Sequence, residues 1–332
     1  MKLLLTGGCG FIGHHFIEGI LKETDWEIVV LDRLDISGSL ERLKDISIWE
    51  KEKHRVKFVW WDLKSEFNDF VKRDIGEVDY IWHLAASSHV DRSIENPLSF
   101  VMDNVVGTCN LLNFARGVKN LRLLIYFSTD EVFGPAPEGT DYKEWDRYNS
   151  GNPYSASKAG GEELCIAFAN TYRMPIIITH TMNVMGERQH PEKFIPMCIR
   201  KIRDGESVTV HANKDKTKAG SRFYIHARNV LKAMLFLTEH HTVGDKYNIV
   251  GEKEIDNLSL AKLIADAVGK PLIYEMVDFH SSRPGHDLRY ALDGSKLKSM
   301  GFDFPKTLEE SLAKTVLWSL QNPRWLDIGS KA

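Results

Sequence analysis

Short apolar runs alternate with longer amphipathic stretches through the first 180 residues. The predicted strands cover residues 2–6, 27–31, 56–60, 80–84, 121–127 and 176–181, and the predicted helices cover residues 11–22, 97–116 and 153–172. Continuously apolar strands such as Leu3-Leu4-Leu5 are typical of strands that are buried on both faces. This alternation of strands and helices predicts an α/β fold built on a doubly wound parallel sheet with right-handed crossovers.

After residue 183 the alternation of predicted strands and helices becomes less regular. Glycines and charges punctuate residues 205–220, and residues 258–268 and 308–320 have the pattern of amphipathic helices. We therefore expect a first domain over residues 1–182, a smaller C-terminal α/β lobe over residues 183–326 with some chain crossover, and a tail over residues 327–332. A ligand cleft is expected between the two parts.

Composition narrows the class of protein. The 43 Lys and Arg against 46 Asp and Glu give a formal net charge of -3, which offers no support for a nucleic-acid partner. The sequence has no run of 18 apolar residues, and the apolar start of the chain ends at Leu5, so neither a transmembrane helix nor a signal peptide is expected. The four cysteines have no paired spacing, which predicts reduced thiols in a cytoplasmic protein without a metal site.

The first chemical motif is a glycine-rich turn between the first strand and the first helix. Gly7, Gly10 and Gly13 have the spacing G-x-x-G-x-x-G, and backbone amides at such a helix start can bind a pyrophosphate closely. A tight connection could use the same glycines. Asp32 ends the next strand, where a carboxylate accepts hydrogen bonds from an adenosine ribose and repels a 2′-phosphate. The motif predicts NAD, although Arg33 beside it would fit NADP.

The second motif is the pair Tyr154 and Lys158, which lie one helical turn apart on one face of a predicted helix. A phenol with an ordinary pKa near ~10 is a poor base at neutral pH. A nearby ammonium, together with the positive nicotinamide ring of NAD+, would lower that pKa and let Tyr154 remove a hydroxyl proton as hydride leaves carbon. The spacing is common by chance, but here Ser128 and Thr129 end a strand between the two motifs.

With both motifs in order, the sequence resembles the extended short-chain dehydrogenase/reductase family, and within it the nucleotide-sugar 4,6-dehydratases of the dTDP-glucose type. The likeness runs from Leu4 to about Trp318. It implies a Rossmann-type NAD-binding domain followed by a nucleotide-sugar-binding lobe. The matching segments are residues 6–13, 83–86, 88–94, 104–108, 128–134, 154–158, 191–196 and 283–287.

The motifs and the resemblance together give a set of expected NAD contacts. Asp62 and Leu63 follow the third strand and are placed to meet the adenine, although a simple strand-end turn explains them nearly as well from spacing alone. The expected contacts are Gly7, Gly10, Phe11, Ile12, Gly13, Asp32, Arg33, Asp62, Leu63, Leu84, Ala85, Ser128, Tyr154 and Lys158.

The adjacent acids Asp130 and Glu131 separate the reactions within this family. Its dehydratases carry the acid pair, whereas its epimerases usually carry a serine and small residues there. The resemblance implies that Tyr154 takes the C4 hydroxyl proton while Thr129 polarises the same oxygen. It also implies that Glu131 takes the C5 proton and that Asp130 protonates the departing C6 oxygen. Two adjacent carboxyls in one cleft should differ in pKa, so one stays protonated near neutral pH; an acidic strand-end turn is the alternative.

The resemblance also implies contacts with the substrate, and arginine's fixed fork of donors suits diphosphate oxygens. Any one of these residues could equally be a surface charge. The chain departs from the family's pattern at residues 35–39, at Ser87 and in a longer link over residues 135–152, which leaves the base and the sugar open. The expected substrate contacts are Ser88, Thr129, Asn183, Lys193, Arg222, Asn257, Arg283 and His286.

The resemblance therefore predicts a lyase that acts on an NDP-hexose, with dTDP-glucose as first choice, and that recycles its NAD internally. Relatives of this type usually dimerise through helices that correspond to residues 97–116 and 153–172, so we expect a homodimer. One alternative is a 4-epimerase or decarboxylase of the same family, which needs no acid pair. A more distant alternative is a non-catalytic NAD-binding regulatory protein.

Overall fold

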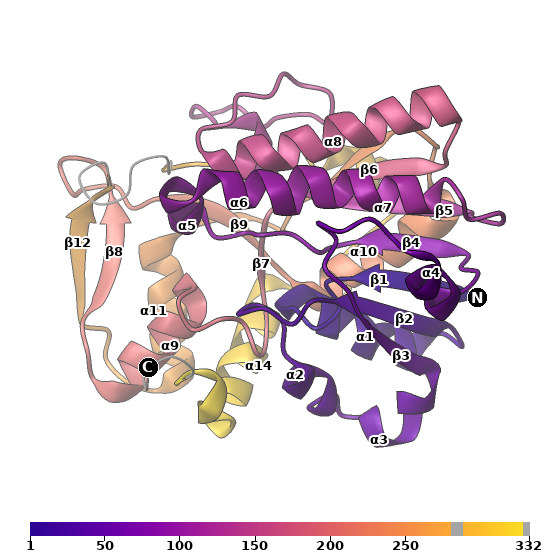
Figure 1. Ribbon diagram of the computed structural model, residues 1–332. Helices are drawn as coiled ribbons and strands as arrows, with labels where there is room; N and C mark the ends of the chain where they lie inside the picture. Colours follow the sequence, from indigo (N-terminus) through magenta and orange to yellow (C-terminus); the bar gives the residue numbers. More distant parts are fainter. Residues whose placement is uncertain (280–287, 328–332) are drawn as a thin grey trace.

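The computed structural model describes residues 1–279 and 288–327. Within these residues, seven parallel strands form a central sheet in the order β10-β6-β5-β4-β1-β2-β3 (Figure 1). The chain winds outward from β1 through β2 to β3 and then returns to place β4 on the other side of β1, so the strand order reverses between β1 and β4. The strands are β1 (Lys2–Thr6), β2 (Glu27–Asp32), β3 (Val56–Trp60), β4 (Tyr80–His83), β5 (Leu123–Thr129), β6 (Ile176–Thr181) and β10 (Lys246–Ile249).

The sheet is covered on both faces, which explains its continuously apolar strands. Successive side chains of a strand point to opposite faces, so Leu3 and Leu5 pack in one core with Phe16, whereas Leu4 packs in the other core with Leu111. One core is closed by α1 (Phe11–Glu23), α2 (Leu40–Lys44), α3 (Trp49–Glu52) and α10 (Ala227–His240), and the other by α4 (Asp69–Ile75), α7 (Gly107–Ala115) and α8 (Pro153–Tyr172). The predicted doubly wound α/β fold is therefore confirmed.

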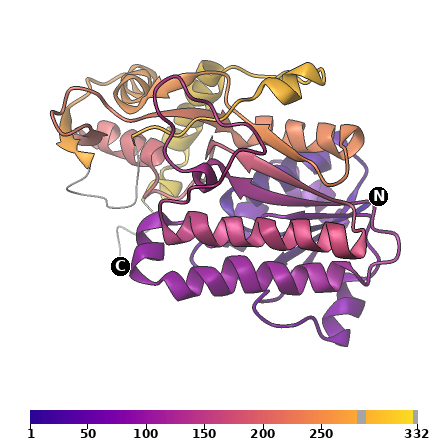
Figure 2. The same cartoon turned by 90° about the horizontal axis from the view of Figure 1, so that it is seen from above.

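Helices α7 and α8 lie side by side along one face of the sheet (Figure 2). The Asn152 side chain accepts a hydrogen bond from the Ser155 amide and Pro153 opens the first turn, which explains why α8 begins there. The stretch predicted as one helix over residues 97–116 consists of α6 (Pro97–Val101), a π-helical turn η2 (Met102–Val106) and α7. Hydrophobic spacing alone does not signal such a turn.

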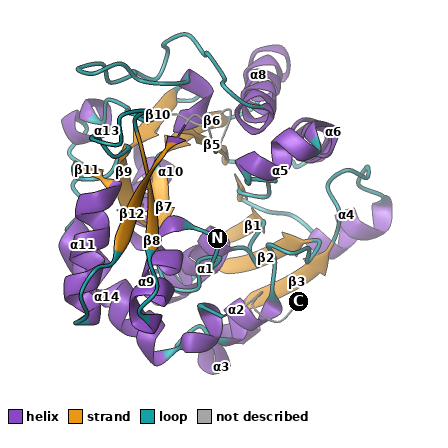
Figure 3. Cartoon of the chain, turned by 90° about the vertical axis from the view of Figure 1, so that its left-hand side faces the viewer, coloured by secondary structure: helices purple, strands orange, loops and turns teal. Residues whose placement is uncertain are grey.

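The rest of the chain forms a second lobe beside the central sheet (Figure 3). The strands of this lobe mix polar with apolar residues, which explains why the apolar pattern did not predict them, and β8 lies inside residues 205–220. Strands β7 (Asn183–Met185), β9 (Ser221–His226) and β11 (Glu254–Asp256) form one small sheet, and β8 (Val208–Ala212) pairs with β12 (Tyr274–Asp278). Helices α9 (Phe194–Asp204), α11 (Asn257–Val268) and α14 (Leu308–Gln321) pack over them in a core of their own.

The chain crosses back from the second lobe to the central sheet. Helix α10 packs against α1, and β10 follows it to pair in parallel with β6 at the edge of the sheet. The remaining short elements are η1 (Lys53–Arg55), α5 (Val90–Glu95), η3 (Asp130–Phe133), α13 (Ser295–Ser299) and η4 (Pro323–Trp325). Among the helices of the described chain, none is long and apolar enough to cross a bilayer.

Candidate active site

A cavity of about 340 Å³ opens where the carboxyl ends of β1, β2, β4 and β5 meet the second lobe. In open parallel sheets this edge, at the reversal of strand order, is where ligands bind. The residues of the sequence-predicted sites that line the cavity are Gly7, Gly10, Phe11, Ile12, Gly13, Asp32, Arg33, Asp62, Leu63, Leu84, Ala85, Ser88, Ser128, Thr129, Asp130, Glu131, Tyr154, Lys158, Asn183 and Lys193.

The glycine-rich turn brings backbone to the floor of this cavity. Gly7 has φ of 72°, a left-handed conformation that favours glycine. A Cβ built on Gly13 would lie 2.3 Å from the Gly7 carbonyl oxygen, so no larger residue fits there. Helix α1 begins directly after Gly10, and its first backbone amides have no partner within the helix. The turn therefore has the shape and the dipole that a dinucleotide pyrophosphate requires.

The carboxylate of Asp32 lies at the end of β2, beside the turn. It accepts hydrogen bonds from the backbone amides of Cys9, at 3.0 Å, and Leu34, at 2.9 Å. Burial raises the pKa of Asp32, while these two amides counteract that effect. Since a carboxylate oxygen can accept more than one hydrogen bond, Asp32 keeps the capacity to receive ribose hydroxyls.

The acid pair lies at the far end of the cavity, where β5 runs into η3. The Thr129 hydroxyl donates to Asp130 at 3.1 Å, and the Asn152 amide donates to Glu131 at 3.1 Å. Asp130 is buried, and one of its carboxyl oxygens has no hydrogen-bond partner among the described residues. Burial and the charge of Glu131 raise the pKa of Asp130 to about 7. The structure thus places a carboxyl group that can carry a proton near neutral pH beside a second carboxyl group.

Tyr154 stands in the first turn of α8, facing the same pocket. Burial and the charge of Glu131 raise its pKa, and a hydrogen bond with Thr129 lowers it. The sequence predicts that Lys158, together with the positive nicotinamide ring of NAD+, lowers this pKa. In the structure the Lys158 ammonium instead donates to the Phe127 carbonyl at 2.8 Å, and burial lowers its own pKa to about 8. Without the dinucleotide, burial is the largest influence on the phenol.

A buried polar network supports the strand that carries these residues. The carboxylate of Glu162, one turn beyond Lys158 on α8, accepts hydrogen bonds from the Ser128 and Tyr148 hydroxyls. It also contacts His180 Nε2 at 3.1 Å. Tyr148 belongs to the link over residues 135–152, so the longer link contributes directly to the network beneath the site.

Two predicted substrate contacts lie outside the lining of the cavity, and two fall outside the described residues. Arg222 is outside the cavity lining: its guanidinium donates to the Ser221 carbonyl at 2.6 Å and the Leu288 carbonyl at 2.7 Å. Its charge still lowers the pKa of Asp130. Asn257 is also outside the lining, and its side-chain oxygen accepts the Tyr224 hydroxyl at 2.8 Å. The other two, Arg283 and His286, lie outside the described residues.

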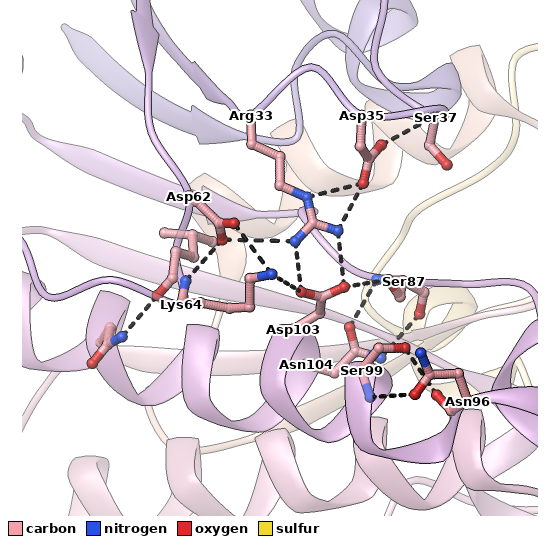
Figure 4. Close-up of polar contacts among 12 residues, drawn as sticks. Arg33, Asp35, Ser37, Asp62, Lys64, Ser87, Asn96, Ser99, Asp103 and Asn104 are labelled. Atoms are coloured by element: carbon pink, nitrogen blue, oxygen red, sulfur yellow. Dashed lines mark hydrogen bonds and ion pairs between the residues drawn. The ribbon is translucent and has the colours of Figure 1, made fainter.

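Several lining residues were not predicted as site residues. The most polar group of them surrounds Arg33, where Asp35, Lys64, Ser87 and Asp103 converge (Figure 4). The departures at residues 35–39 and Ser87 were visible in the sequence, whereas nothing in the pattern connected Asp103 with Arg33. Gln189 and His190, from the loop after β7, complete the lining on the side of the second lobe.

Comparison with known proteins gives a consistent result. The model of the NAD dependent epimerase/dehydratase family matches residues 3–250. A dTDP-glucose 4,6-dehydratase from Salmonella typhimurium is 34% identical in an alignment that covers 98% of this chain and 95% of that protein. The crystal structure of a dTDP-glucose 4,6-dehydratase from Streptomyces venezuelae with NAD bound superposes with a TM-score of 0.88, at 32% identity, over 99% of both chains. A UDP-glucose 4-epimerase from Thermus thermophilus, in complex with NAD, gives a TM-score of 0.84 at 27% identity, over 95% of this chain and 98% of that one.

Proposed function

The chain belongs to the NAD dependent epimerase/dehydratase family, and from that premise we propose that it is a nucleotide-sugar 4,6-dehydratase. Its substrate would be an NDP-hexose, with dTDP-glucose as first choice, and its product the 4-keto-6-deoxy sugar. The observation that carries the proposal is the acid pair Asp130-Glu131 in the cavity, where burial and the charge of Glu131 raise the pKa of Asp130 to about 7. The named relatives at 34% and 32% identity agree with the dehydratase predicted from sequence.

The predicted cofactor, NAD, is confirmed by the family and by the NAD-bound structures of the relatives. Its role in this chemistry is to accept hydride from the sugar and return it. The glycine turn would hold the pyrophosphate of NAD, and Asp32 would hold the adenosine ribose. Lys158 would hold the part of NAD that lies nearest the acid pair. We assign this binding to the domain over residues 1–182, and the nucleotide sugar to the lobe over residues 183–326.

Acid–base chemistry falls to four side chains that face the cavity. Tyr154 takes the proton of the C4 hydroxyl while Thr129 holds the same oxygen. The resulting ketone acidifies the C5 hydrogen, which Glu131 removes as a general base. Asp130 donates its proton to the departing C6 oxygen, which leaves as water.

The atoms balance without an external reductant. The hydrogen that leaves C4 as hydride is returned at C6, and C5 regains a proton. The proton that Tyr154 takes replaces, in the net reaction, the proton that Asp130 loses to water. One water is therefore the only by-product, and the family's epimerases need neither acid for their reaction.

A substrate panel tests the proposal. Purified protein is incubated separately with dTDP-glucose, UDP-glucose and GDP-mannose, and the product is followed by its absorbance in alkali, which reports a 4-keto sugar. A 4-keto-6-deoxy product from one of the three is expected. If the product is an isomer of the substrate and no water is lost, the protein is an epimerase and not a dehydratase. If none of the three substrates is turned over, a binding protein is supported instead.

We further propose a homodimer through the face formed by α5, α6 and η2. Leu98 is 68% exposed and Val101 41% exposed, next to the partly exposed Ile94 and Met102. Exposed apolar side chains gathered on one face are typical of a protein interface. Sedimentation velocity should give a dimer, which Leu98→Arg should dissociate; the matched variant Phe70→Arg, at an apolar side chain exposed on α4, should leave it intact. A wild-type monomer would contradict this proposal.

We also propose that the protein works in the cytoplasm. All four cysteines are free, and Cys9, Cys165 and Cys198 are buried, which suits a reducing compartment. Fractionation of the source cells should recover the protein with soluble cytoplasmic markers. Recovery with exported proteins would contradict the assignment.

A further inference from the structure

Arg33 is the first residue after Asp32, at the end of the cavity assigned to the adenosine ribose. Its guanidinium donates to both carboxylate oxygens of Asp103, at 2.6 and 2.8 Å. It also donates twice to one oxygen of Asp35, at 2.9 and 2.7 Å. The Arg33 side chain is therefore held between the carboxylate of Asp35, two residues further along the chain, and that of Asp103 (Figure 4).

Asp103 is fixed where it stands. It belongs to the π-helical turn η2, and its carboxylate also accepts the Ser87 hydroxyl at 2.6 Å. Its neighbour Asn104 bonds the Ser87 backbone in both directions, at 2.9 Å each, which ties the turn to the loop after β4. The Asp103 side chain is 10% exposed and that of Arg33 27%, so the ion pair is partly shielded from water.

We call the six charged residues at this place the ribose end: Asp32, Arg33, Asp35, Asp62, Lys64 and Asp103. Four of them are carboxylates and two are cations. Lys64 lies 3.4 Å from Asp62 and 3.9 Å from Asp103, so both cations already face carboxylates. A 2′-phosphate would bring further negative charge to this end, whereas ribose hydroxyls bring hydrogen-bond donors.

An arginine directly after the strand-end acid would ordinarily offer a bidentate site for a 2′-phosphate. We propose that Asp103 and Asp35 determine the choice of dinucleotide by holding Arg33, so that the cavity takes NAD and rejects NADP. The charge of Arg33 is neutralised by carboxylates of the protein, and its N–H groups donate to those carboxylates. This inference rests on the assignment of the cavity to NAD and adds two specificity-determining residues from outside the glycine motif.

Equilibrium binding tests the inference without any turnover. Affinities for NAD+ and NADP+ are measured by calorimetry on the wild type, Asp103→Asn and the double variant Asp35→Asn/Asp103→Asn. Hydrogen bonds to charged groups contribute enough to expect the ratio of NADP+ to NAD+ dissociation constants to fall about tenfold in the double variant, and by less in the single one. An unchanged ratio in both would overturn the proposal.

Two controls separate the held arginine from a general effect of charge. Asp62→Asn removes the same single charge, but Asp62 lies 3.6 Å from Arg33 and accepts none of the four hydrogen bonds that Arg33 donates to Asp35 and Asp103. The ratio of NADP+ to NAD+ dissociation constants should therefore change less in Asp62→Asn than in Asp103→Asn. Adding Arg33→Met to the double variant should cancel its gain in NADP+ affinity. A gain that persists without Arg33, or an equal effect of Asp62→Asn, would show that net charge alone decides. A wild type that binds neither dinucleotide would instead refute the cofactor assignment itself.

Discussion

The cavity contains an aspartate at each end, Asp103 at the ribose end and Asp130 at the acid pair, and the two serve different purposes. At the ribose end, burial would raise the pKa of Asp103, but hydrogen bonds from Arg33 and Ser87 and the charge of Arg33 hold it below its ordinary value. At the other end, burial and the charge of Glu131 raise the pKa of Asp130 to about 7. A carboxyl that touches an arginine stays ionised and structural, whereas one that touches a second acid can carry a proton to a leaving group.

The strongest way to break this comparison is to remove the proton acceptor at the acid pair. Glu131→Gln keeps the size of the side chain and the hydrogen bond from Asn152 but cannot accept the C5 proton. Loss of a positioned general base should slow dehydration by about 10²–10⁴-fold. Tyr154 and Lys158 are untouched, so oxidation at C4 should survive. Rapid-quench and absorbance measurements should show transient NADH without loss of water.

Deuterated water provides the matched measurement for the same variant. The wild type should place solvent deuterium at C5 of its product, while Glu131→Gln should release almost none of that product. Dehydration at the wild-type rate by the glutamine variant would show that another group is the base, and the dehydratase proposal would lose its main support.

The next largest effect is expected at the phenol. Tyr154→Phe removes the group that takes the C4 hydroxyl proton, so the first oxidation should slow by about 10²–10⁴-fold. Binding of the nucleotide sugar, measured by calorimetry, should change little. Single-turnover reduction of bound NAD+ reports the step directly. An unaltered rate of reduction would assign the base elsewhere in the cavity.

The raised pKa of Asp130 predicts a pH limit on the reaction. General acid catalysis needs the protonated carboxyl, so the rate of dehydration should fall about tenfold per pH unit above pH 7. Asp130→Asn should be slow at every pH and should lack this limb of the profile. A wild-type rate that is level up to pH 9 would remove Asp130 from the role of acid.

The same group links pH to stability, with a definite sign. The pKa of Asp130 is about 7 in the folded chain against 3.8 as its ordinary value, so the folded state binds the proton more tightly. Stability that is fully present below pH 3.8 is therefore lost as pH rises toward 7, by up to roughly 4 kcal/mol. Asp130→Asn stays neutral, so urea unfolding should show it gaining on the wild type between pH 4 and 8. Parallel curves for the two proteins would contradict the raised pKa.

The sequence predicted the central sheet well because buried parallel strands are continuously apolar. Two strands of this sheet are exceptions. Strand β10 was not predicted, because its sequence Lys-Tyr-Asn-Ile mixes polar with apolar residues. Strand β5 was expected over residues 121–127 but continues to Thr129, since Ser128 and Thr129 keep pairing with β6. The three-residue strands β7 and β11 have too few positions for any period to show, and tertiary packing sets them.

The candidate site also contains residues that the sequence could predict and residues that it could not. The acid pair could be predicted because Asp130 and Glu131 are contiguous and stand in a motif. The contact between Arg33 and Asp103 could not, because the residues are 70 positions apart and meet only through the π-helical turn. Arg222 matched a motif, yet its guanidinium bonds backbone carbonyls of the second lobe outside the cavity lining.

The smallest predicted effect concerns a third carboxylate, Glu162, which shows that burial alone does not decide the comparison. Glu162 is as buried as Asp130, and burial raises its pKa, but His180, Lys246 and the Ser128 hydroxyl lower it overall. Tyr148→Phe removes one donor from this network while keeping the ring on Phe133, so it should lower the free energy of unfolding by about 1 kcal/mol.

Tyr142→Phe is the matched control for Tyr148→Phe. Its ring also packs on Phe133, but its hydroxyl donates to the Pro135 carbonyl in an exposed position, at 3.0 Å. Water can replace that partner, so this variant should lose less than about 0.5 kcal/mol in the same urea titration. Equal losses in the two variants would mean that the Tyr148 hydroxyl adds nothing to the stability of the ionised carboxylate. His180, Lys246 and the Ser128 hydroxyl would then keep Glu162 charged, as Arg33 and Ser87 do for Asp103 at the ribose end, and Tyr148 would contribute only its aromatic ring.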